Sequence, residues 1–207
     1  MSNTQSMPTT TKARIVSEAR RLFAEQGYAT TGLTAIRAAA GVHAGSLYHA
    51  FPSKQALLIA VLEDYLAQMD DRLVGPAWAG VDDPIERIFA LLARYRQFLI
   101  DTGFMFGCPI GFIALEIHQP DDDVRALIWE NFNNWMKRVR DCLDQVEFAS
   151  PTDLDNVATL VLTTMEGAVM LARTARSIAP FDQSVTALRD YISRLSAEPA
   201  PSNSGQS

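Results

Sequence analysis

The sequence predicts an all-α protein of about nine helices. Apolar residues recur at helical spacing through most of the chain, and no segment shows the apolar–polar alternation of a half-buried strand. Glycine and proline interrupt the apolar stripes at positions suited to helix ends. Apolar residues make up 48% of the 207 residues, which is enough for a substantial core.

The first three predicted helices are short and closely spaced. Thr10 or Thr11 is a suitable N-cap for the first, which Gly27 ends. The second spans roughly 33–40 and the third about 44–50. Together they indicate a small N-terminal helical head.

Longer helices account for most of the remaining chain, with a loop expected at 75–83. Capping residues and prolines place their starts, and the apolar stripes place their ends. The six are expected from the Ser53 cap through Met69, from Asp83-Pro84 through Leu99, from Pro109 to about His118, from the Asp121–Asp123 cluster through Leu143, from Pro151-Thr152 to about Ser177, and from an Asp182 cap through Leu195.

Residues 38–51 have the pattern of a helix-turn-helix. An apolar helix stops at Gly41, a short turn follows, and a second helix then begins. Leu47 and Phe51 are four residues apart and are expected to point inward, which leaves the opposite face for the major groove of DNA.

The outward face of this second helix is suited to close approach. Small residues at 44–46 let the backbone come near the duplex, and Tyr48 and His49 can donate hydrogen bonds to phosphates or base edges. Lys54 and Thr31 are placed to contact phosphates on either side. The residues expected to face DNA are Thr31, Arg37, His43, Ala44, Gly45, Ser46, Tyr48, His49 and Lys54.

The charge distribution agrees with a DNA-binding head. The net charge of the chain is −6, but residues 1–60 carry six bases against two acids and so have a charge of +4. The remaining residues carry twelve bases against twenty-two acids, a charge of −10. A basic head on an acidic body is typical of a DNA-binding protein with a second domain.

Residues 14–58 resemble the DNA-binding head of the TetR/AcrR family of transcriptional regulators. The residues that carry the resemblance are Arg14-Ile15, Ala19, Leu22-Phe23, Gly27-Tyr28, Thr31, Ile36, Ala40-Gly41-Val42, Gly45, Leu47-Tyr48, Phe51 and Ser53-Lys54. Arg37, His43 and Ala44 depart from the residues usual in the family. The segment 106–116, with Gly107-Cys108-Pro109, is similar to one branch, the LmrA/YxaF-like regulators.

The resemblance, together with the helix pattern, gives a domain organisation. A flexible arm is expected at 1–10, the helix-turn-helix domain at 11–52, and an effector-binding and dimerisation domain at 53–196. Residues 53–74 form a linking helix in this scheme, and residues 197–207 are expected to be disordered because they are rich in Pro, Ser and Gly.

The middle of the chain is rich in aromatic and methionine residues, which suit a pocket for an apolar ligand, although a filled core has the same composition. Two carboxylates, Glu116 and Glu166, lie in apolar helices and would need a partner or a ligand if buried. The candidate effector-binding residues are Trp78, Tyr95, Phe98, Phe112, Glu116, Trp129, Phe132, Trp135, Met165 and Glu166.

The family resemblance implies that the last two helices pair with those of a second subunit. Small residues on one side of the helix ending near Ser177 would allow close helix approach, and packing within one chain explains them equally well. The candidate dimer residues are Gly167, Ala168, Leu171, Ala172, Ala175, Leu188 and Ile192. A dimer would bind two half-sites of a pseudo-palindromic operator.

The sequence thus predicts a ligand-responsive DNA-binding regulator, most readily a repressor that a small, largely apolar effector releases by moving the linking helix. An enzyme is not expected, because the three histidines are scattered and no phosphate loop, nucleophile motif, metal site or cofactor site is present. Two cysteines and no signal or membrane segment suggest a cytoplasmic protein. The alternatives are an activator, or a small-molecule or Cys108 thiol sensor that has lost sequence-specific DNA binding.

Overall fold

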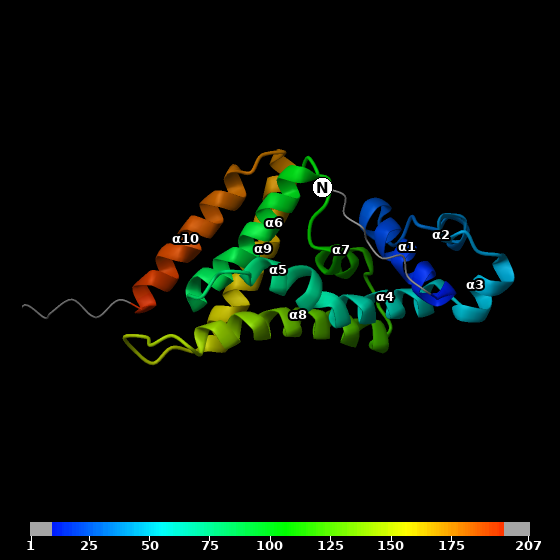
Figure 1. The fold of residues 1–207 in the computed structure, drawn as a ribbon. Coiled ribbons are helices and arrows are strands. Elements are labelled where there is room, and N and C mark those ends of the chain that lie inside the picture. The colour runs from blue at the N-terminus through cyan, green and yellow to red at the C-terminus, as the bar shows by residue number, and fades with distance from the viewer. Residues whose placement is uncertain (1–9, 197–207) are drawn as a thin grey trace, which may run out of the picture. The chain divides into compact units, whose positions relative to one another are not determined.

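The computed structural model describes residues 10–196, which are helical apart from connecting turns (Figure 1). This range contains ten α-helices, one π-helical segment and no strand, so the all-α prediction is confirmed. Nine helices correspond to the predicted ones, and the tenth is a four-residue helix in the predicted loop at 75–83. Of the predicted arm at 1–10, residues 1–9 lie outside the described residues, as does the predicted tail at 197–207, whereas Thr10 is described and caps the first helix.

The described chain forms two compact units. The first unit contains residues 10–72 and 105–133. Its helices are α1 (Thr11–Gln26), α2 (Leu33–Ala40), α3 (Ala44–Ala50), α4 (Lys54–Met69), α7 (Pro109–Glu116) and the N-terminal part of α8 (Asp122–Leu143).

Helix α1 is the centre of the first unit, because it packs against α2, α3, α4 and α7. The Thr10 hydroxyl caps it by accepting from the Ala13 N–H at 3.1 Å, as expected for a threonine N-cap. Gly27 ends it at φ 87° and donates its N–H to the Phe23 carbonyl at 3.0 Å. The buried residues of α1 follow the predicted stripe and are Ile15, Val16, Ala19, Leu22 and Phe23.

Helix α4 begins with the predicted cap. The Ser53 hydroxyl accepts from the Ala56 N–H at 3.0 Å. Arg20 of α1 forms an ion pair with Asp64 of α4 at 2.8 Å and lies over the Tyr65 ring. Burial raises the pKa of Tyr65 above its ordinary value, so this phenol stays neutral and packs as part of the α1–α4 contact.

The predicted linking helix 53–74 changes its winding before it ends. Regular α-helix stops at Met69, a π-helical segment follows at Asp70–Val74, and α5 (Gly75–Trp78) continues to Trp78. Pro76 lacks an N–H and cannot donate to a preceding carbonyl, so the α-helical ladder is interrupted here. Sequence periodicity does not detect this change, because the chain stays helical throughout.

The second unit contains residues 73–104 and 134–196. Its helices are α5, α6 (Pro84–Asp101), the C-terminal part of α8, α9 (Leu154–Ala175) and α10 (Ala179–Ser196). Helices α9 and α10 form the largest helix pair and α6 packs against both. Asp83 caps α6 as predicted by accepting from the Glu86 N–H at 2.8 Å.

The predicted role of Asp182 as an N-cap is wrong. Helix α10 begins at Ala179, so Asp182 lies within its first turn and its carboxylate accepts from Arg96 of α6 at 2.7 and 2.9 Å. A second pair, Arg189 with Glu86, also joins α10 to α6. The arginine hydrogen bonds lower the pKa of both carboxyls. These long-range partners could not be identified from local spacing.

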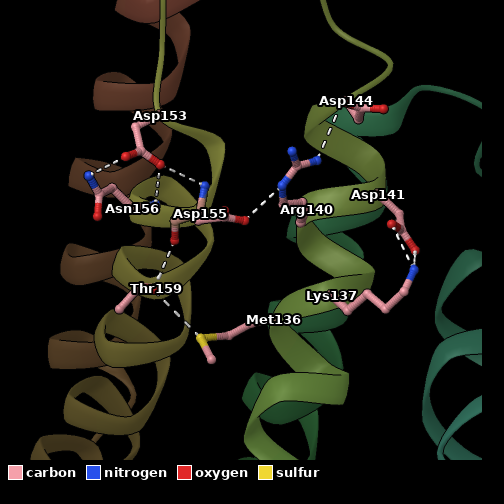
Figure 2. Close-up of polar contacts among 9 residues, drawn as sticks. All are labelled: Met136, Lys137, Arg140, Asp141, Asp144, Asp153, Asp155, Asn156 and Thr159. Atoms are coloured by element: carbon pink, nitrogen blue, oxygen red, sulfur yellow. Dashed lines mark hydrogen bonds and ion pairs between the residues drawn. The ribbon is translucent and has the colours of Figure 1, made fainter.

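The C-terminal part of α8 is joined to the start of α9 by polar contacts (Figure 2). Arg140 pairs with Asp155 at 2.7 Å and also reaches Asp144 at 3.4 Å. Asp153 caps α9 by accepting from the N–H groups of residues 155 and 156, so the helix begins at Leu154 rather than at the predicted Pro151-Thr152. These exposed contacts fix the geometry of the turn more than they add stability.

Helix α9 is long and apolar enough to cross a membrane by length and composition alone, and no other helix within residues 10–196 meets that test. Packing explains much of this apolar character, because α9 buries Val157, Ala158, Val161, Leu162, Met165, Ala168, Val169 and Ala172 against its neighbours in the second unit.

Replacing Ser53 with alanine removes the α4 cap and leaves an N–H of the first turn without its side-chain acceptor. We expect Ser53→Ala to lower the free energy of unfolding by about 1 kcal/mol, measured by urea denaturation followed by circular dichroism. Ser193→Ala, an exposed serine within α10, is the control and should change stability by less than about 0.5 kcal/mol. Equal effects of the two substitutions would contradict the capping role.

Candidate DNA-binding interface

The turn between α2 and α3 has the predicted helix-turn-helix geometry. Gly41 ends α2 in the left-handed region, at φ 63° and ψ 41°, where a side chain would be strained. Its N–H donates to the Ala38 carbonyl, and the Val42 N–H donates to the Arg37 carbonyl at 3.2 Å. Helix α3 then begins at Ala44, after a turn of three residues.

Helix α3 separates a buried face from an exposed one. Leu47 is 1% exposed and Phe51, which follows the helix directly, is 3% exposed, so both form the inner face as predicted. Tyr48 is 55% exposed and His49 is also exposed. Ala44, Gly45 and Ser46 are exposed as well. The five predicted contact residues of α3 are therefore all exposed, and the two buried apolar side chains pack the helix against the rest of the head.

Lys54 lies at the start of α4 and is held by the turn between α1 and α2. Its Nζ donates to the Ala29 carbonyl at 3.1 Å and lies 4.4 Å from the centre of the Tyr28 ring. Burial lowers the pKa of Lys54, and the nearby Glu116 carboxylate partly offsets that effect. The half-buried ammonium is thus a positive charge of fixed position beside α3.

Thr31 does not fit the predicted phosphate contact. The residue is 1% exposed, and its hydroxyl donates to the carbonyls of Gly27 at 2.7 Å and Leu22 at 3.2 Å. The side chain therefore stabilises the end of α1. Arg37 is half-buried in the last turn of α2, and His43 is exposed at the N-cap position of α3 without a side-chain capping bond.

Lys12 was missed as a candidate. Its Nζ lies 5.5 Å from the centre of the Phe51 ring, which places an exposed ammonium beside the end of α3 in addition to the half-buried Lys54. The basic charge of residues 1–60 included Lys12, but only the fold shows which of those bases lies near α3.

The predicted effector residues are divided between the two units. Phe112, Glu116, Trp129 and Phe132 belong to the first unit, and the other six belong to the second. Trp129 is 58% exposed. Glu116 does not meet the condition of burial on which its need for a ligand depended: it is exposed at the C-terminal end of α7 and accepts from the Ala29 N–H. Cys108 is buried, which does not favour a thiol sensor open to oxidants.

In the second unit, Trp135 and Met165 are buried, Tyr95 and Glu166 are partly buried, and Phe98 is exposed. The Trp135 Nε1 is buried without a hydrogen-bond partner among the described residues. Trp78 has a structural role, because its indole N–H donates to the Arg87 carbonyl at 2.9 Å and its ring lies beneath the Arg87 guanidinium.

The predicted dimer residues divide into buried and outward sets. Ala168, Ala172, Leu188 and Ile192 are buried within one chain, mainly in the α9–α10 contact, so they are not available to a partner. Leu171 and Ala175 are exposed and Gly167 is partly exposed. These three lie on one stripe of α9 at helical spacing, together with Leu160, Thr163, Met170 and Thr174.

Comparison with known proteins agrees with this architecture. Residues 15–61 match the model for bacterial regulatory proteins of the TetR family, and residues 84–187 match the model for the C-terminal domain of LmrA/YxaF-like transcriptional regulators. The chain belongs to the TetR family. Its LmrA/YxaF-like character, predicted from segment 106–116, is also confirmed.

Individual TetR-family proteins match over nearly their full length. The transcriptional regulator Rv0196 of Mycobacterium tuberculosis is 29% identical, covering 87% of this chain and 93% of the relative. The transcriptional repressor DhaR of a Mycobacterium species (strain GP1) is 27% identical, covering 89% and 93%. A TetR transcriptional regulator from Chloroflexus aurantiacus is 31% identical with a TM-score of 0.75, covering 89% and 94%. This TetR-family chain is therefore a transcriptional regulator with a helix-turn-helix DNA-binding head.

Truncation of two adjacent residues of α3 should have very different effects on stability. Leu47→Ala removes a fully buried side chain and should lower the free energy of unfolding by about 2–5 kcal/mol, whereas Tyr48→Ala should change it by less than about 0.5 kcal/mol. Urea denaturation of the two variants, with the wild type alongside, measures both. A larger loss from Tyr48→Ala would contradict the assignment of the two faces.

Proposed function

We propose that this TetR-family regulator is a repressor that binds a pseudo-palindromic operator as a homodimer and is released by a small, largely apolar effector. The observation that carries the proposal is the outward face of α3, where Tyr48 and His49 project beside the small residues 44–46. Small residues permit close approach of the helix to base edges, and the two large side chains supply the directional contacts.

Basic side chains near α3 support a phosphate-binding role. Lys54 is held in place by Ala29 and Tyr28, and Lys12 lies beside Phe51. A positioned ammonium contributes to DNA affinity without reading sequence, because it displaces counterions from the phosphates. The name of the relative DhaR, a transcriptional repressor, supports repression as the mode of control.

The outward stripe of α9 supports assembly into a dimer. Met170 is 55% exposed and Leu171 is 50% exposed, and Leu160 lies on the same stripe. Large apolar side chains gathered on one helix face indicate a protein interface, and the small Gly167 and Ala175 allow close helix approach. Two copies would present two α3 helices to two half-sites.

The second unit supports a ligand-responsive role. Trp135 is buried and its Nε1 has no hydrogen-bond partner within residues 10–196, while Met165 on α9 is fully buried. An orphaned buried N–H is unfavourable unless a water or a ligand supplies an acceptor. An apolar effector that supplies one acceptor would satisfy the Trp135 N–H, and it must bind the DNA-free conformation more tightly than the DNA-bound one.

The proposal is tested by fluorescence anisotropy with the DNA that flanks the reading frame, beside scrambled DNA of equal length, at two salt concentrations. We expect tight binding to one flanking segment and weak, strongly salt-dependent binding to the scrambled DNA. Lys54→Gln should weaken binding to all sequences and reduce the salt slope by about 1. Lys137→Gln, an exposed lysine of the second unit, should leave both unchanged. If no flanking segment binds tightly, DNA sites are selected by the protein from a pool of random sequences. Selected sites that bind no more tightly than scrambled DNA would contradict operator recognition.

Replacing Leu171 with glutamate places a charge on the outward stripe of α9. We expect Leu171→Glu to yield a folded monomer in sedimentation analysis and to lose most of its operator affinity, because one half-site contact is then lost. Leu115→Glu, at an even more exposed leucine of α7, is the matched control and should remain a dimer. A dimeric Leu171→Glu protein would exclude this stripe as the interface.

A further inference from the structure

A single residue of the DNA-binding head is bound on both sides of its backbone. Ala29 lies in the turn between α1 and α2. Its N–H donates to the Glu116 Oε2 of α7 at 3.2 Å, and its carbonyl accepts from the Lys54 Nζ of α4 at 3.1 Å. All of these residues belong to the first unit, and Glu116 is 87 residues from Ala29 along the chain.

The fit of the carboxylate against this turn is close. A Cβ atom on Gly27 would overlap Glu116 Oε1, so a larger residue at this position would force the carboxylate to shift. Gly27 also adopts φ 87°, which glycine reaches without strain. Glycine at position 27 thus suits the end of α1 and also leaves room beside the turn for the Glu116 carboxylate.

The three groups form a short polar chain from α7 to α4. Glu116 and Lys54 have opposite charges, and the Glu116 charge raises the pKa of Lys54 against the larger effect of burial. The two charged groups bind the same residue through adjacent peptide units, Glu116 through the Ala29 N–H and Lys54 through the Ala29 carbonyl. Ala29 is thereby held from α7 on one side and from α4 on the other.

We propose that Glu116 is a positioning residue that latches α7 to the turn between α1 and α2, and so couples α7 to the DNA-binding head. The latch keeps this turn in place while the Lys54 ammonium, still bound to the Ala29 carbonyl, donates a further N–H to a DNA phosphate. Displacement of α7 releases the Ala29 N–H, loosens the turn and lowers the affinity of the head for its operator. The last step rests on the proposed function, whereas the latch itself does not.

The latch is tested by hydrogen–deuterium exchange of the DNA-free, full-length protein, read on peptides that cover residues 27–32. We expect Glu116→Ala to speed exchange there about fivefold, as for the loss of one partly exposed charge-assisted hydrogen bond. Glu116→Gln keeps an oxygen acceptor for the Ala29 N–H and should stay within about twofold of the wild type. Glu130→Ala, an exposed glutamate of α8 in the same unit, should match the wild type.

Unchanged exchange in Glu116→Ala would overturn the latch. Exchange in Glu116→Gln as fast as in Glu116→Ala would also overturn it, because the effect would then come from charge alone. These readouts need no DNA, so they decide on the latch even for a protein without operator binding.

Operator affinity tests the coupling. Both Glu116→Ala and Glu130→Ala remove one negative charge, which by electrostatics alone would raise the affinity for DNA. Loosening of the turn lowers the affinity, and only Glu116→Ala loosens it. We therefore expect Glu116→Ala to bind the operator about fivefold more weakly than Glu130→Ala. Equal or tighter binding by Glu116→Ala, in a protein whose turn exchanges faster, would overturn the coupling of the latch to the head. Absence of operator binding by the wild type would instead contradict the proposed function.

Discussion

The apolar side of α1 is the surface on which the first unit depends. Helices α2, α3, α4 and α7 all pack on it, and its central residues Ile15 and Ala19 are fully buried. An isolated helix as short as α3, with seven residues, is unstable in water because nucleation is unfavourable. The position of α3 therefore comes from Leu47 and Phe51 beneath it, and its outward face can carry residues chosen for DNA rather than for folding.

Ion pairs have a different part in this fold from the apolar contacts. The Arg20–Asp64 pair is partly buried between α1 and α4, and the Arg96–Asp182 and Arg189–Glu86 pairs join α6 to α10 in the second unit. The two pairs of the second unit are exposed and contribute little free energy, so they mainly select which faces of α6 and α10 meet. Their pattern explains why Asp182 is a partner of α6 rather than a cap.

Local signals in the sequence were sufficient for most of the fold. Glycine at 41 and caps at Ser53 and Asp83 act within four residues, and helical periodicity identified the buried stripe of α1. The inner and outer faces of α3 followed from the four-residue spacing of Leu47 and Phe51. The π-helical segment was not predictable, because its residues keep a helical pattern.

The candidate site was less accessible to sequence reasoning, because its contacts join distant residues. Glu116 looked like a buried carboxylate in an apolar helix, yet its partner is a backbone N–H in the head. The small residues of α9 have the same chemistry, but Ala168 and Ala172 are buried within the chain, whereas Gly167 is partly exposed and Ala175 is exposed. A one-residue step along a helix rotates a side chain by about 100°, and only the packing decides which side meets its own chain.

The outward apolar stripe of α9 affects how the amount of active protein depends on the concentration of the chain. In a protein that assembles through such a stripe, folding and association are linked by mass action, so the stability of each chain rises with the concentration of its partner. At low copy number the dimer concentration varies as the square of the chain concentration. For a regulator that assembles in this way, halving the supply of chain removes far more than half of the dimer, and occupancy of a DNA site changes more steeply than for a monomeric binder.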